Sequence, residues 1–376
     1  MPPARWQLEN NELILVSMIG LTPAHCYARQ MILPEIGENG QKKLQQARIL
    51  LVGAGGLGSP IALYLAASGI GHITMVDGDV VEASNLHRQI LYGPADIGEK
   101  KVLVAAQKLR AQFPFLHINT APYHLDVDNA AALVASHDIV VDGTDDLFTR
   151  YVLNRACLQL KKPLVYGAVW RFSGQVSVFC VDGQQQEAAC LACLFPTPPD
   201  EAPNCAEAGV VGVVPGLVAQ IQAGEVLKYL LGMGKLLSNR LWQYDLLTAE
   251  LKMLELARNI NCPACGAGAS LQWLPAMTQT CSLHEVNWPE WPALQQAGVK
   301  LLDVREEEEW EQRRHPDATL YPLSQIQQWV QELPKDQPYL LMCHAGVRSM
   351  KAAYYMKEQG FSTLYSLKGG IAAWRG

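Results

Sequence analysis

Apolar and polar positions along the first part of the chain repeat one pattern, a short apolar run followed by a longer stretch with helical spacing. The apolar runs predict buried strands. They are expected at Ile49–Val52, at His72–Val76, at His117–Pro122 and within the segment HDIVVDGTDD (137–146), and two more are expected inside Pro163–Val181. Helices are predicted at 36–47, Ile61–Ala67, Lys100–Phe113 and Asn129–Ser136. Strands separated by helices of about 10 to 15 residues indicate an α/β fold with a parallel, doubly wound sheet.

A second α/β pattern begins near Cys281, after a break in composition at 266–280 that is typical of a linker. Its predicted elements are strands at Val299–Val304 and Pro338–Met342, a charged helix start at Glu306–Arg314, and helices at Ser324–Leu333 and Met350–Gln359. We therefore expect a second, smaller α/β domain at 281–376.

The composition allows two cores and excludes some classes of protein. With 376 residues and 49% hydrophobic content, the chain can bury two domains. A net charge of −6 argues against a nucleic-acid surface. The apolar stretch Glu12–Leu21 is too short to span a membrane and lacks signal-peptide features, and Met18 is a second candidate start. Ten cysteines, four of them in two C-x-x-C pairs, fit a reducing, cytoplasmic location.

The segment Arg48–Gly58 reads RILLVGAGGLG, a strand that breaks into a glycine-rich turn before a helix. Its glycines are Gly53, Gly55, Gly56 and Gly58. Unpaired N–H groups and the positive end of the helix dipole favour a phosphate there. The turn therefore predicts a nucleotide site.

Polar residues after the next strand indicate which nucleotide chemistry is expected. Asp77 has the position of a residue that binds a ribose hydroxyl. The residues that follow it combine amides, a carboxylate and two cations, namely Asp79, Asn85, Arg88, Gln89 and Lys101. Such cations can neutralise charge that develops on a phosphate, whereas a hydride-transfer site needs no such cluster. An NAD-dependent oxidoreductase is therefore the weaker alternative.

Four segments, RQMILPEIG, GAGGLG, DGDVVEASNLHRQ and GTDD, together resemble the E1-like adenylating enzymes that activate ubiquitin-fold sulfur carriers. The most similar groups are the molybdopterin-synthase and thiamine-thiazole activators. The resemblance covers about 25–265, which leaves 1–24 as an N-terminal extension. It implies a Rossmann-like, ATP-binding adenylation domain.

The resemblance also implies roles for individual residues. Asp145 matches the aspartate that binds Mg²⁺ in the family, while Asp142 and Asp146 are expected to cap a helix or face solvent. Arg29 would reach the nucleotide of the neighbouring subunit in a homodimer, the alternative being a surface arginine. Single histidines without ligand partners are expected to be structural, at His72, His124 and His137.

The cysteines divide into pairs and single residues. Two C-x-x-C pairs supply the four thiolates of a closed Zn²⁺ site, at Cys190, Cys193, Cys262 and Cys265, and the family has such a site. Cys205 lies in a proline-rich, acidic segment and is a candidate nucleophile; in the family, a cysteine there attacks the acyl-adenylate or joins a mixed linkage with the carrier. Small buried hydrophobic roles are expected for Cys26, Cys157, Cys180 and Cys281.

Cys343 follows a predicted strand in the segment CHAGVRS, where backbone N–H groups and a helix N-terminus can stabilise a sulfur anion. Arg348 would add positive charge. Together with LLDVREEEEW and LKGGIAAW, this segment resembles a rhodanese domain, which implies that Cys343 accepts sulfur as a persulfide; RRHPDATL departs from the family's usual loop. Asp303 and Arg305 are interpreted as a structural pair and Glu306–Glu309 as a solvated helix start.

These features predict a chain that adenylylates the C-terminal glycine of a small ubiquitin-fold carrier ending in Gly-Gly and then transfers sulfur from Cys343 to it, giving a thiocarboxylate. ATP and Mg²⁺ are expected at the first domain, and the sulfur donor is a cysteine desulfurase or thiosulfate. Molybdopterin, thiazole and tRNA thiolation all remain open as pathways. The main alternative is an E1 enzyme that passes a ubiquitin-like protein on as a Cys205 thioester, with the second domain as a docking or regulatory module.

Overall fold

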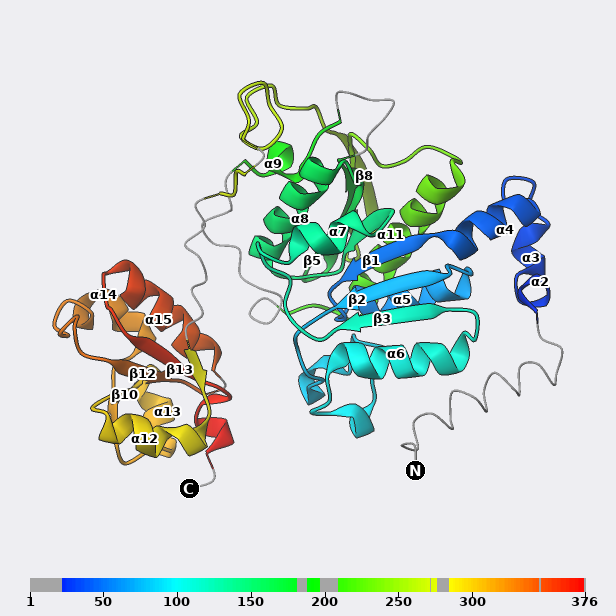
Figure 1. The fold of residues 1–376 in the computed structure, drawn as a ribbon. Helices are drawn as coiled ribbons and strands as arrows, with labels where there is room; N and C mark the ends of the chain where they lie inside the picture. Colours follow the sequence, from blue (N-terminus) through cyan, green and yellow to red (C-terminus); the bar gives the residue numbers. More distant parts are fainter. Residues whose placement is uncertain are drawn as a thin grey trace. The chain divides into compact units, whose positions relative to one another are not determined.

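A computed structural model describes residues 22–180, 188–196, 209–270, 272–275, 284–344 and 346–374 (Figure 1). The chain divides into two compact units, Met1–Pro275 and Ala276–Gly376. Each unit has its own sheet, so the two are described separately.

The first unit has an eight-stranded sheet in the order β3-β2-β1-β4-β5-β6-β7-β8. The strands are β1 Arg48–Val52, β2 His72–Val76, β3 His117–Ala121, β4 Ile139–Asp142, β5 Leu164–Trp170, β6 Ser173–Phe179, β7 Arg240–Asp245 and β8 Glu250–Glu255. Strands β1 to β5 pair in parallel, which confirms the α/β prediction. Strands β6, β7 and β8 extend the sheet in antiparallel pairs, and of these the sequence pattern predicted only β6.

Helices of the first unit connect the strands and cover the sheet. They are α2 Pro23–Cys26, α3 Ala28–Met31, α4 Gly37–Gln46, α5 Gly58–Ala67, α6 Lys101–Gln112, α7 Ala130–Ala135, α8 Leu147–Leu160, α9 Leu191–Leu194 and α11 Val213–Leu231, with short 3₁₀ turns η1 Ala83–Asn85 and η2 Pro94–Asp96. The long helix α11, absent from the sequence-based predictions, packs on α5, β5 and β6. Within the described ranges, none of the helices combines the length and apolar character that a bilayer span requires.

Both faces of the parallel strands are buried, because successive side chains point to opposite faces. Ile49 and Leu51 join one core with side chains from α4, α5, α6 and α11. Leu50 and Val140 point to the opposite face and are also fully buried. This explains why these strands have continuous apolar sequences rather than alternating ones.

The second unit has a five-stranded parallel sheet in the order β11-β10-β12-β13-β9. The strands are β9 His284–Val286, β10 Lys300–Asp303, β11 Ala318–Leu320, β12 Tyr339–Met342 and β13 Leu364–Leu367. The helices are α12 Trp291–Gln296, α13 Glu307–Gln312, α14 Ile326–Trp329 and α15 Val347–Glu358, with 3₁₀ turns η3 Trp288–Glu290, η4 Leu323–Gln325 and η5 Gly370–Ala373. Two apolar cores, one on each face, enclose β12.

Two helices of the second unit differ from the predictions. The helix expected at Ser324–Leu333 is a 3₁₀ turn followed by the four-residue α14, which ends at Trp329. Pro334 accounts only for the absence of helix at Leu333, the residue directly before it. Helix α15 begins three residues earlier than expected, directly after Gly346, which has φ +97°. This conformation favours glycine.

Candidate functional site

The glycine turn between β1 and α5 is closely packed against the ends of neighbouring strands. The N–H of Gly53 donates to the Val76 carbonyl at 2.8 Å. A Cβ atom at Gly53 would lie 2.5 Å from the Gly143 carbonyl oxygen, and one at Gly58 would lie 1.9 Å from the Gly53 oxygen. Glycine is therefore required at both positions, and the turn brings together the carboxyl ends of β1, β2 and β4.

Arg88 and Gln89 lie over this turn. A Cβ atom at Gly55 would be 3.5 Å from Gln89 Nε2, and one at Gly56 would be 3.5 Å from Arg88 Cδ. Gln89 is buried, yet its Oε1 has no hydrogen-bond partner among the described residues. A buried amide oxygen costs free energy unless it is paired, so a donor group on a bound ligand would satisfy it.

Asp77 directly follows β2, and its carboxylate binds the backbone of the glycine turn. Its Oδ2 accepts a hydrogen bond from the Ala54 N–H at 2.7 Å, and its Oδ1 accepts one from the Asp79 N–H at 2.8 Å. These bonds fix the carboxylate beside the glycine turn, where the sequence predicts a ribose.

Lys101 and Asp79 form an ion pair at the same edge, with 2.8 Å between Nζ and Oδ2. The Lys101 side chain is only 8% exposed while that of Asp79 is 55% exposed, so the pair links the first turn of α6 to the surface of the site. Asn85 is also buried here, in η1. His124 is exposed, with Nε2 3.8 Å from Asp79 Oδ1. The adjacency of β2 and β3 brings these two residues together, because His124 follows β3 and Asp79 follows β2.

The expectation for Asp142 is wrong: it neither caps a helix nor faces solvent. Its side chain is fully buried and accepts hydrogen bonds from the N–H and Oγ1 of Thr144. Arg150 Nε lies 3.4 Å from its Oδ2. Burial raises the pKa of the Asp142 carboxyl, and the nearby guanidinium opposes this shift. Asp142 therefore stabilises the loop that packs against Gly53.

The two aspartates that follow occupy different positions. Asp146 is the N-cap of α8 and accepts a hydrogen bond from the Thr149 N–H at 2.7 Å, which confirms its predicted capping role. Asp145 is exposed. An exposed carboxylate at this edge of the sheet can coordinate a divalent cation.

The four paired cysteines come together in space. The sulfurs of Cys190, Cys193, Cys262 and Cys265 all lie within 4.8 Å of one another, including 3.7 Å between Cys190 and Cys262 and 3.4 Å between Cys193 and Cys265. A tetrahedral ion with Zn–S bonds of about 2.3 Å requires sulfurs about 3.8 Å apart. The cluster fits a four-thiolate metal site.

The predictions for the single cysteines, Arg29 and His137 differ in how they compare with the structure. Cys157 and Cys180 are buried as predicted, whereas Cys26 is exposed because α2 lies at the surface. Arg29, on α3, is also exposed. Cys205 and Cys281 lie outside the described residues. His137 is structural as expected, since its ring nitrogens contact the Leu133 carbonyl and the Thr74 hydroxyl.

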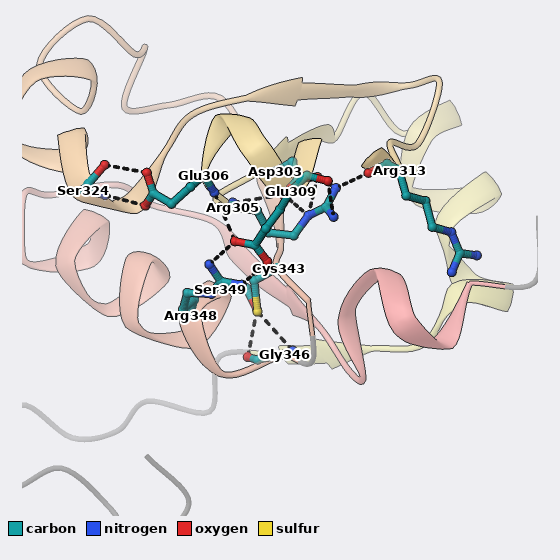
Figure 2. Close-up of polar contacts among 10 residues, drawn as sticks. All are labelled: Asp303, Arg305, Glu306, Glu309, Arg313, Ser324, Cys343, Gly346, Arg348 and Ser349. Carbon is teal, nitrogen blue, oxygen red and sulfur yellow. Dashed lines mark hydrogen bonds and ion pairs between the residues drawn. The ribbon is translucent and has the colours of Figure 1, made fainter. Parts of the chain in front are cut away.

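In the second unit, Cys343 directly follows β12 and is almost fully buried. The Gly346 N–H donates to its Sγ at 3.1 Å, and the Ser349 hydroxyl lies 3.6 Å from the same sulfur (Figure 2). The Ser349 hydroxyl also donates to the Gly346 carbonyl at 2.8 Å, which fixes the loop. A donor directed at the sulfur, here the Gly346 N–H, stabilises a charged thiolate or persulfide.

Arg348 does not present an unpaired charge to Cys343. Its two terminal nitrogens donate to the two carboxylate oxygens of Glu309 at 2.6 and 2.7 Å (Figure 2). Hydrogen bonds from Arg348 hold the pKa of Glu309 at about 2. The expectation that Glu306–Glu309 is simply solvated is therefore wrong for Glu309, because its carboxylate faces the first turn of α15.

Asp303 and Arg305 form the structural pair that the sequence predicted. Arg305 Nη2 lies 2.6 Å from Asp303 Oδ2, and both side chains are almost fully buried. Arg305 also donates to the carbonyls of Glu309 and Arg313, at 3.2 and 2.6 Å. The pair thus holds both ends of α13 against the sheet.

Comparisons with known proteins match both units. A ThiF family model matches residues 27–264, and a rhodanese-like domain model matches 291–376. The chain is 37% identical over 365 residues to the probable adenylyltransferase/sulfurtransferase MoeZ of Mycobacterium tuberculosis, covering 93% of this chain and 92% of the relative. It is 47% identical over 261 residues to a sulfur carrier protein adenylyltransferase of Thermus thermophilus, covering 69% of this chain and 96% of the relative.

A solved structure has the same fold over part of the chain. The crystal structure of E. coli MccB with ATP superimposes with a TM-score of 0.54 and 22% sequence identity, covering 61% of this chain and 71% of MccB. At this identity the similarity concerns the fold alone.

The Glu309–Arg348 pair predicts a pH dependence of stability. Arg348 lowers the pKa of Glu309 from 4.5 to about 2 on folding, so the stabilisation is complete above about pH 4.5 and is lost as the pH falls toward 2. We expect the difference in urea unfolding midpoint between wild type and Glu309→Gln to narrow between pH 5 and pH 3. Glu308→Gln, an exposed position on the same turn, is the control. If the difference in urea midpoint stays the same from pH 5 to pH 3, Arg348 does not lower the pKa of Glu309 in the folded protein.

Proposed function

The chain belongs to the ThiF family and ends in a rhodanese-like domain, and on this premise we propose that it adenylylates a ubiquitin-fold sulfur carrier and then transfers sulfur to it. Its relatives named adenylyltransferase, sulfurtransferase and sulfur carrier protein adenylyltransferase support both activities and the class of substrate. The observation that best supports the sulfur-transfer step is a hydrogen bond in the loop after β12, in which the Gly346 N–H donates to Cys343 Sγ at 3.1 Å.

In the first reaction, the C-terminal carboxylate of the carrier attacks the α-phosphate of ATP, and pyrophosphate leaves. The glycine turn Gly53–Gly58 and the N-terminus of α5 hold phosphate oxygens, and Asp77 holds the ribose. Arg88 and Lys101 neutralise the developing charge. The unpaired Gln89 Oε1 supports a bound ligand over the turn.

Further contacts to the nucleotide come from three more residues. Asp79 and Asn85 orient the triphosphate or its cation, and Asp79 is already held by Lys101. Arg29, exposed on α3, reaches the nucleotide of the partner subunit in a homodimer. Asp145 holds Mg²⁺, an ion that would offset charge on the phosphate oxygens.

In the second reaction, the outer sulfur of the Cys343 persulfide attacks the activated carbonyl and displaces AMP, which links the carrier to Cys343 through an acyl disulfide. A second thiolate, for which Cys205 is the candidate, then attacks the Cys343 sulfur, forms a disulfide with it and releases the carrier as a thiocarboxylate. The Gly346 N–H stabilises the sulfur anion. The guanidinium of Arg348 interacts electrostatically with Cys343 while its terminal nitrogens bind Glu309. A docking or regulatory module, as the thioester-forming alternative requires, has no need for a backbone donor directed at a buried thiol.

Zinc, domain boundaries and cellular context complete the proposal. Zn²⁺ is held by the four clustered thiolates and has a structural role, because all four ligands come from the protein. The adenylation domain extends over 25–265, after an N-terminal extension at 1–24, and the rhodanese-like domain over 281–376, joined by 266–280. The cytoplasm, where thiols stay reduced, suits this chemistry. A cysteine desulfurase or thiosulfate supplies the sulfur.

Replacing Cys343 separates the two reactions. We expect Cys343→Ala to retain carrier-dependent exchange of pyrophosphate into ATP, because the glycine turn belongs to the other unit. The same variant should form no thiocarboxylate, as measured by the intact mass of a carrier ending in Gly-Gly after incubation with ATP, Mg²⁺ and thiosulfate. Formation of thiocarboxylate at the wild-type rate would disprove the role of Cys343, and absence of exchange in the wild type would disprove the first reaction.

The metal site gives a prediction of its own. Wild-type protein should contain about one zinc per chain by elemental analysis, as a four-thiolate site requires. Cys193→Ser combined with Cys262→Ser should remove the metal and lower the melting temperature. Cys26→Ser is the matched control, since Cys26 is exposed and lies outside the cluster. Zinc content that is unchanged in the double variant would refute the site.

A further inference from the structure

The guanidinium of Arg348 is occupied by a carboxylate beside the Cys343 loop. Both Nη atoms donate to Glu309, one to each carboxylate oxygen, in the planar two-bond arrangement that is strongest for this pair of groups. The two side chains are 33% and 34% exposed, so solvent and small solutes can reach them. An anion that approaches Cys343 therefore meets an arginine that already binds a carboxylate through one N–H of each terminal nitrogen.

The backbone of α13 holds Glu309 in this position. Arg305, fixed by the buried Asp303, donates to the Glu309 carbonyl. The Glu306 N–H donates to Glu309 Oε2 at 3.4 Å in a capping box at the start of the helix. Figure 2 shows this chain of contacts from the sheet to the Cys343 loop. Since these contacts order the carboxylate in advance, little side-chain entropy is lost when it binds Arg348.

The ion pair also changes the charge that Cys343 experiences. The guanidinium of Arg348 interacts electrostatically with Cys343, and the carboxylate of Glu309 neutralises it. A small dianion such as thiosulfate at Cys343 would therefore have to compete with Glu309 for this guanidinium.

We propose that Glu309 is a positioning and specificity-determining residue of the Cys343 loop, which holds Arg348 and thereby weakens the binding of donors that carry a sulfonate group. Donors that bring sulfur as a persulfide on an uncharged thiol are not subject to this competition. The inference rests on the proposed role of Cys343 as the sulfur acceptor.

The two donor reactions differ in their leaving group. With thiosulfate, the Cys343 thiolate attacks the outer sulfur, a new S–S bond forms, and the bond to the sulfonate sulfur breaks with its electron pair leaving on sulfite. With a thiol persulfide, the same attack on the outer sulfur releases the donor's thiolate. Only the first reaction places a dianion beside Arg348, so only the first depends on whether the guanidinium is free.

Kinetics of the full-length protein test the proposal. Sulfur loading of Cys343 is measured with thiosulfate and with 2-hydroxyethyl persulfide for wild type, Glu309→Gln and the control Glu308→Gln. We expect Glu309→Gln to lower the KM for thiosulfate about tenfold, as one freed hydrogen bond to a charged group allows. The kcat for thiosulfate and both constants for the persulfide should stay within about twofold, and Glu308→Gln should change the KM by less than about twofold.

A double-mutant cycle with Arg348→Gln separates this mechanism from a general charge effect. If Glu309 acts through Arg348, Glu309→Gln has no effect on the thiosulfate KM in the Arg348→Gln background. An equal fall in KM for Glu308→Gln, a fall that persists without Arg348, or no fall at all would overturn the proposal. Melting curves confirm that each variant is folded. Failure of wild-type Cys343 to gain sulfur from either donor would instead refute the proposed function itself.

Discussion

Parallel strand pairing is the constraint on which both candidate centres depend, because it places the carboxyl ends of neighbouring strands on one edge of a sheet. In the first unit, the pairing of Val52 with Val76 and with Asp142 brings the glycine turn beside Asp77 and the GTDD loop. In the second unit, the pairing of Asp303 with Met342 places Arg305 and Cys343 on adjacent loops. Residues far apart in sequence thus meet at one edge of a sheet, where side-chain contacts such as Lys101–Asp79 and Arg348–Glu309 form.

Tight backbone packing and buried ion pairs then fix the loops at these edges. Gly53 and Gly58 allow close approach of backbone atoms that any Cβ atom would prevent. Asp303 and Arg305 hold α13 through its backbone carbonyls, and α13 in turn presents Glu309 to Arg348. Removing one partner of a buried pair leaves an uncompensated charge, which is costly. We therefore regard the Asp303–Arg305 pair as the support of the sulfur site rather than as a participant in its chemistry.

Sequence patterns predicted the elements whose signals are local. The parallel strands, the glycine turn, the clustered cysteines and the capping role of Asp146 follow from apolar runs, spacing and residue type. The partners of Arg348 and Asp142 could not be predicted, because they depend on how loops after different strands approach each other. The β7–β8 hairpin was missed because β8 is exposed along its whole length and lacks a buried apolar run.

The central claim is that one chain makes an acyl-adenylate in its ThiF unit and supplies sulfur to it from Cys343. A single-turnover experiment with a heavy sulfur isotope tests this claim most directly. Cys343 is first loaded with the heavy isotope and freed of donor, and carrier, ATP, Mg²⁺ and an excess of unlabelled donor are then added together. We predict that the first thiocarboxylate formed contains the heavy isotope, as measured by the intact mass of the carrier. A first product that contains only light sulfur would contradict the account, because the sulfur would then have reached the carrier without passing through Cys343.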